Sequence, residues 1–257
     1  MSDERTEVPG WGIPVEAQAS VLLAEARRLV NDGDLEGAVG IAEELLDHDP
    51  GDLDALLLVA DVAPRYGHGE VGVLAAQQVR RLGAEVGAIE AAALFAACEF
   101  EAALEAADTC LAGAPADARA HAVRGQVLEV LGRLPEADEA LAAAHALRPE
   151  AYPLPLPVAD ADWEPLLMEA LGRLEPEDRE AVRRWTVVWH PAPDPALLTS
   201  SHPPIPPSTI AVVSVADGEE LVCSVFTRNL ARGCATEGEV IARLSRALGE
   251  EAAQLEE

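Results

Sequence analysis

The chain has 257 residues, of which 49% are hydrophobic and only 4% aromatic, and its 46 acidic residues outnumber its 18 basic ones. A formal net charge of −28 repels a phosphate backbone and an anionic membrane surface, so we expect neither a nucleic acid nor a membrane as partner. The acid excess leaves two interpretations open: it keeps the protein in solution, or it selects basic protein partners.

Residues 1–18 form a polar, acidic N-terminal extension that begins MSDERTEVPGWG. No apolar stretch follows a basic start, as it would in a secretory signal, and no run of about 18 apolar residues predicts a membrane span. We therefore expect a cytoplasmic protein.

Residues 19–150 carry a repeated arrangement of alanine, glycine, leucine and proline. Prolines that end one amphipathic helix and precede the next stand at Pro50, Pro115 and Pro149, at intervals of 65 and 34 residues. A 34-residue period fits these intervals if one boundary near Ala84 is unmarked. The sequence therefore predicts four repeats, each made of two helices.

Small residues recur where the two antiparallel helices of one repeat must cross closely. In the first frame Ala26 would face Ala38, and Gly33 would make the turn between the helices. In the fourth frame Gly125 would face Ala137. Stacked neighbours would then bury a shared core.

The four frames resemble the tetratricopeptide repeat (TPR) family, and a generic alanine-rich helical bundle is the alternative that stays open. The resemblance implies a superhelix in which the first helix of each repeat lines a groove for a peptide or a partner helix. The groove-facing candidates, which mix charged, polar and apolar side chains and so specify no ligand, are Arg27, Leu57, Asp61, Phe95, Arg119, Gln126 and Glu129.

The sequence predicts no cofactor-binding site. The four cysteines form no C-x-x-C pair, and we expect Cys98 and Cys110, in alanine-rich helical sequence, to be buried thiols. The chain has no lysine, so G-x-x-x-x-G-K-[ST] is absent. Residues 67–72 (GHGEVG) match G-x-G-x-x-G, but they lie within the helical repeats and follow no predicted strand, so they do not predict a phosphate-binding loop. We therefore expect no cofactor.

Residues 151–161 (AYPLPLPVADA) are rich in proline, which cannot continue a helix, and we predict a linker there between two domains. Residues 162–257 then predict a small α+β domain. Its expected elements are a helix over 163–174, a helix after Pro176, a strand over 185–190, a proline-rich loop over 191–207, β-rich runs over 210–215 and 221–226 joined by an Asp-Gly turn, and a helix from about Glu237. The loop is either a plain surface loop or a partner-binding segment.

This order of elements, with the segment Val225–Arg232 (VFTRNLAR) as a strand end, resembles the minimal zincin-like family of bacterial metallopeptidases. In that family a helix follows with the motif H-E-x-x-H, whose histidines bind zinc while the glutamate polarises the metal-bound water. The best register here reads Gly249-Glu250-Glu251-Ala252-Ala253, so both histidines are absent. The resemblance therefore implies a degenerate domain with no metal and a vestigial Glu250.

We predict a mainly α protein, a TPR-like superhelix followed by a small zincin-like α+β domain, that acts as a non-catalytic scaffold for protein partners. One alternative is a zinc metallopeptidase with unconventional ligands, for which His190 precedes the proline-rich loop and His202 lies within it. It predicts stoichiometric zinc and loss of activity on Glu250→Gln. Another is a subunit that is stable only within a larger assembly. The sequence names neither the partner, nor the pathway, nor the oligomeric state, and it leaves open whether Arg228 and Asn229 contact a peptide.

Overall fold

The computed structural model describes residues 15–216 and 220–255, and the chain divides into two compact units, Met1–Val86 and Gly87–Glu257. We call them the N-terminal and the C-terminal unit. The division falls between the second and third helix pairs, whereas the sequence predicts a domain boundary at residues 151–161, which stays a prediction. The predicted Asp-Gly turn and most of the predicted N-terminal extension lie outside the described residues.

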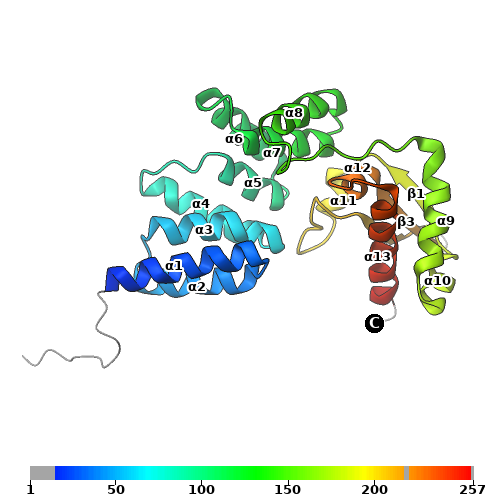
Figure 1. The fold of residues 1–257 in the computed structure, drawn as a ribbon, viewed down its shortest axis with the longest axis horizontal. Coiled ribbons are helices and arrows are strands. Elements are labelled where there is room, and N and C mark those ends of the chain that lie inside the picture. The colour runs from blue at the N-terminus through cyan, green and yellow to red at the C-terminus, as the bar shows by residue number, and fades with distance from the viewer. Residues whose placement is uncertain (1–14, 217–219, 256–257) are drawn as a thin grey trace, which may run out of the picture. The chain divides into compact units, whose positions relative to one another are not determined.

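The N-terminal unit consists of two antiparallel helix pairs (Figure 1). Its elements are α1 (Val15–Asp32), α2 (Leu35–His48), α3 (Leu53–Val62), the 3₁₀ helix η1 (Ala63–Tyr66) and α4 (Gly69–Arg81). Helix α3 contacts α1, α2 and α4, so the first helix of the second pair packs against both helices of the first. Ala26 and Ala38 are fully buried, as expected for a close helix crossing.

The C-terminal unit begins with two more helix pairs. They are α5 (Ala88–Ala96), α6 (Phe100–Gly113), α7 (Ala118–Val130) and α8 (Leu134–Leu147). Helix α7 contacts α5, α6 and α8, which repeats the arrangement of α3. The structure therefore confirms the predicted series of four helix pairs.

The turn inside each helix pair has a residue in the left-handed region. These residues are Gly33, Gly67, Cys98 and Gly132, with φ angles of 87°, 97°, 61° and 73°. Their spacings are 34, 31 and 34 residues, so the predicted 34-residue period is wrong between the second and third repeats. The cause is helix length: α5 has 9 residues where α7 has 13, a loss of about one turn.

The cysteine predictions need correction. Cys98 lies in the turn between α5 and α6 rather than inside a helix, and both Cys98 and Cys110, which lies in α6, are half-buried rather than buried. Burial still raises the pKa of the Cys98 thiol. Cys223 and Cys234 are the buried pair, and desolvation followed by the charge of Glu251 raises the pKa of Cys223 to about 12.

The remaining elements of the C-terminal unit form an α+β region. They are η2 (Asp160–Asp162), α9 (Trp163–Arg173), α10 (Pro176–Val182), β1 (Thr186–His190), α11 (Pro195–Leu198), β2 (Ala211–Val215), β3 (Leu221–Phe226), α12 (Thr227–Ala231) and α13 (Glu237–Leu255). The predicted helices and strands are confirmed. Two expectations are corrected: the loop over 191–207 contains α11, and the strand within Val225–Arg232 ends at Phe226, where α12 begins.

The three strands are ordered β1-β3-β2, with β1 parallel and β2 antiparallel to β3. One face of the sheet packs against α9 and α13, which lie side by side (Figure 1). Cys223 and Val225 are fully buried on that face. Because side chains alternate along a strand, Ser224 and Phe226 point to the opposite face.

Candidate functional site

The predicted groove residues of the N-terminal unit lie on α1 and α3. Arg27 is exposed, and its Nη2 donates to Oδ1 of Asp54 at 3.0 Å. Leu57 and Asp61 are half-buried on α3. The first helices of neighbouring repeats are thus joined by a surface ion pair, which contributes little to stability because both side chains are more than 60% exposed.

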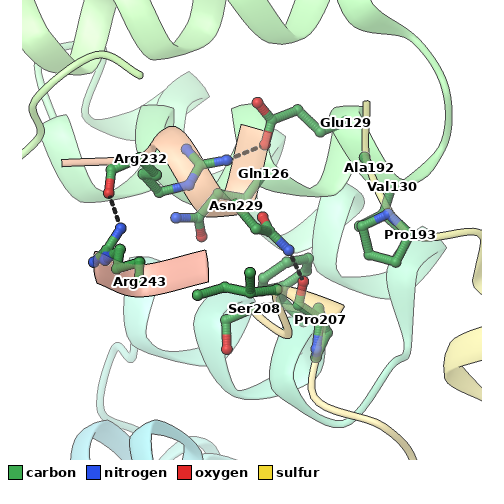
Figure 2. A pocket seen from close by; sticks show the side chains of 12 residues that line it. Gln126, Glu129, Val130, Ala192, Pro193, Pro207, Ser208, Asn229, Arg232 and Arg243 are labelled. Atoms are coloured by element: carbon green, nitrogen blue, oxygen red, sulfur yellow. Dashed lines mark hydrogen bonds and ion pairs between the residues drawn. The ribbon is translucent and has the colours of Figure 1, made fainter. Parts of the chain in front are cut away.

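In the C-terminal unit, three predicted groove residues line one cavity of about 190 Å³: Phe95, Gln126 and Glu129. Arg119 is half-buried and does not line it. The other walls come mainly from the α+β region (Figure 2), through Ala192, Pro193, Pro207, Ser208, Ile210, Asn229, Arg232 and Arg243. The face of α5 and α7 that carries these three residues is therefore in contact with the chain's own α+β region.

Glu129 is the centre of this contact. Its side chain is only 2% exposed, and both of its carboxyl oxygens accept hydrogen bonds from arginine side chains. Oε1 accepts from Arg228 Nε at 2.5 Å, and Oε2 accepts from Arg232. Arg228 also donates to Asp138 on α8. A buried carboxylate is tolerated only with such partners, so these ion pairs hold α12 against α7 and α8.

The backbone around α12 is fixed by further side chains (Figure 2). Asn229 donates from Nδ2 to the carbonyls of Pro207 and Thr209, each at 2.8 Å. Arg243 of α13 donates from Nη1 to the carbonyls of Leu230 at 3.3 Å and Arg232 at 2.5 Å. Arg228 and Asn229, the sequence candidates for peptide contact, thus both bind the chain itself.

Sequence reasoning missed Arg232 and Arg243 as members of this site. The segment VFTRNLAR does show two arginines at helical spacing, since Arg228 and Arg232 stand four residues apart. Nothing in the sequence connects them with Glu129, which precedes them by 99 and 103 residues.

The register that replaces H-E-x-x-H lies on α13, as predicted. Glu250 is exposed, whereas Oε2 of Glu251 accepts a hydrogen bond from the Val213 backbone N–H of β2 at 2.9 Å. Desolvation raises the pKa of Glu251, the Val213 N–H partly opposes this, and the charge of Glu250 adds to it. Within residues 15–216 and 220–255, no group of three or more His, Cys, Asp or Glu side chains could hold a metal ion.

We expect Glu251→Gln to stabilise the protein at pH 7. The folded-state pKa of Glu251 is raised, so folding favours its protonated form, and this contribution is lost as the pH rises through that pKa. Glutamine keeps an acceptor for the Val213 N–H without the charge. Urea denaturation should show a higher free energy of unfolding at pH 7 and no difference below the unfolded pKa of about 4.3. The control is Glu250→Gln, at an exposed side chain, and we expect it to have a smaller effect. A Glu251→Gln variant less stable than the wild type at pH 7 would contradict a raised pKa of Glu251.

No protein-family model and no curated protein matches the chain. Solved structures that resemble it include TPR proteins. One is TTC0263, a thermophilic TPR protein in Thermus thermophilus, with 22% identity, a TM-score of 0.46, and coverage of 51% of this chain and 74% of that one. Another is MamA from Desulfovibrio magneticus RS-1, from residue 41 to its end, with 24% identity, a TM-score of 0.43, and coverage of 52% and 77%.

At these TM-scores the likeness carries no functional argument, and the helix-pair architecture rests on the contacts and turns described above. These solved structures give no support to the zincin-like resemblance of residues 162–257. In the part of the chain that the structure describes, no helix combines the length and the apolar character needed to cross a membrane. The chain is thus similar, over about half its length, to TPR proteins.

Proposed function

We propose that this protein is a non-catalytic interaction scaffold that binds a protein partner through the first helices of its N-terminal repeats, α1 and α3. One observation carries the proposal: the face of α5 and α7 that carries the predicted groove residues already contacts a folded protein surface, the chain's own α+β region. Equivalent positions in the four repeats can be found by counting back from the residue with positive φ in each turn. Six residues before it stand Arg27, Asp61, Ala92 and Gln126. Gln126 lines the internal contact, so its equivalents Arg27 and Asp61 are suited to an external one.

Charge supports a basic partner. Between residues 19 and 86 the sequence has thirteen acidic residues and five arginines. Carboxylates in such excess steer a positively charged surface toward the repeats and repel an acidic one, chiefly through the rate of association. The strength of binding should therefore fall as ionic strength rises.

The absence of catalysis is also part of the proposal. Gly249 and Ala253 cannot supply the imidazoles that hold zinc in a zincin, and without a metal ion Glu250 has no polarised water to act on. We propose that the α+β region, whether or not it descends from a zincin, serves as a docking surface. No observation favours the metallopeptidase alternative.

The test is an affinity purification of partners with the full chain as bait, after chemical crosslinking, at low and at moderate salt. The groove variant combines Arg27→Ala with Leu57→Ala, and the control is Leu74→Ala, an exposed leucine on α4, the second helix of the same repeat as Leu57. A stoichiometric partner should be retained by the wild type and the control and lost by the groove variant. Retention by all three would remove α1 and α3 as the binding surface, and a wild type that retains nothing would overturn the scaffold function.

A further inference from the structure

A larger cavity of about 480 Å³ lies elsewhere in the C-terminal unit, between α8, the proline-rich segment 154–158 and α12. We call it the linker groove. Its apolar lining includes Leu141, Leu154, Leu156, Val158 and Trp163. No residue of α1 or α3 lines it, so it is distinct from the surface proposed above.

The composition of segment 154–158 leaves it with few backbone donors. Prolines alternate with apolar residues there, and a proline lacks the N–H needed to pair with a neighbouring strand. One backbone hydrogen bond, from Leu156 N–H to the Ala231 carbonyl at 3.1 Å, ties the segment to α12. Leu156 and Val158 pack partly against the core, whereas Leu154 stays 43% exposed.

The rim of the linker groove is acidic. Asp138, with a side chain 61% exposed, borders it on α8, and the exposed Asp160 borders it on η2. Among the described lining residues the basic one is Arg228, whose charge is already shared between Glu129 and Asp138. The groove thus combines an apolar floor with unbalanced negative charge.

We propose that the linker groove binds a short segment of a basic protein partner. A leucine-sized apolar side chain of that segment fills the space beside Leu154 and Trp163, and flanking arginines or lysines lie beside Asp138 and Asp160. Charge complementarity selects this occupant, because a second copy of a chain with a net charge of −28 meets the same acidic rim with like charge.

Leu154 offers a variant with a matched control. Leu154→Asp places a carboxylate on the apolar floor, while Leu147→Asp changes a leucine on α8 that is equally exposed, at 43%, but outside the groove. The probe is a fluorescein-labelled synthetic peptide in which two leucines are flanked by arginines, measured by fluorescence anisotropy with the full chain. Leu154→Asp should weaken its binding about tenfold or more, and Leu147→Asp should not.

The charge contribution is tested separately. Asp160→Asn should weaken the probe severalfold, and Asp162→Asn, a neighbouring exposed carboxylate that does not line the groove, should have a smaller effect. A peptide with the leucines changed to serine, or the arginines to glutamate, should lose binding. Circular dichroism melting of each variant shows whether the fold is kept.

Three results would overturn the linker groove as a docking site: no binding of the probe, equal binding by Leu154→Asp, or equal binding of the glutamate peptide. A wild-type dimer that Leu154→Asp dissociates, seen by light scattering, would assign the groove to a second copy instead. The Arg27→Ala, Leu57→Ala variant should bind the probe normally. Failure at the linker groove is therefore distinguishable from failure of the α1 and α3 surface.

Discussion

Replacing Glu129 by glutamine is expected to lower the free energy of unfolding of the C-terminal unit by about 2–4 kcal/mol. The substitution removes the carboxylate that binds Arg228 and Arg232 and leaves two guanidinium groups without their central partner. Breaking a fully buried ion pair costs about 3–5 kcal/mol. The expected loss is smaller because the arginine side chains keep 20% and 23% of their surface exposed and Arg228 retains Asp138.

Urea denaturation followed by tryptophan fluorescence measures this change in the relevant unit. Three of the four tryptophans, Trp163, Trp185 and Trp189, lie in the α+β region, so the signal reports chiefly on the C-terminal unit. The matched control is Glu136→Gln, which breaks a pair with Arg133 whose side chains are both about 45% exposed. It should stay within about 0.5 kcal/mol of the wild type. Equal losses in the two variants would show that Glu129 has no special role.

A double-mutant cycle with Arg232→Gln separates pairing from burial. If the ion pair is the cause, the second substitution should cost less in the Glu129→Gln background than in the wild type. Additive losses would mean that the two side chains act independently. The contact between α7 and α12 would then depend on apolar packing alone.

Gly125→Ala should lower the free energy of unfolding by about 1–3 kcal/mol, although alanine is the better helix former by about 1 kcal/mol. A Cβ at this position would stand 2.6 Å from Leu141 Cγ, 2.8 Å from Leu141 Cδ2 and 3.2 Å from the Ala137 carbonyl oxygen. Helices α7 and α8 would have to separate, and α7 also carries Glu129. The loss should therefore extend to the contact with the α+β region.

The control for Gly125 is Gly172, on α9 of the same unit. A Cβ there meets nothing within 4 Å, so Gly172→Ala should leave the stability unchanged or raise it by a few tenths of a kcal/mol. The same urea titration serves both variants. Destabilisation by both would point to helix geometry rather than to the crossing of α7 and α8.

Local patterns made most of the secondary structure predictable. Gly33 and Gly132 indicate turns between helices because glycine adopts a positive φ without strain. The alanines at positions 26 and 38 predict a close helix crossing, and both are buried. The strand over 221–226 followed from its β-branched composition. The sequence did not predict the turn at Cys98, because a non-glycine residue with positive φ has no sequence pattern that marks it.

The sequence by itself determined the helix pairs, the glycine turns at Gly33 and Gly132, the strands and the acidic character of the chain, because each depends on residues close together in the chain or on composition. Tertiary structure decided the rest. The parallel pairing of β1 with β3 and the burial of Glu129 against α12 both depend on which distant segments meet. From the sequence, Glu129 is predicted to be a solvated group on a helix surface. The fold places two arginines, about a hundred residues further along the chain, against it. Both the desolvation cost of the carboxylate and its compensation by these arginines arise only from the tertiary structure.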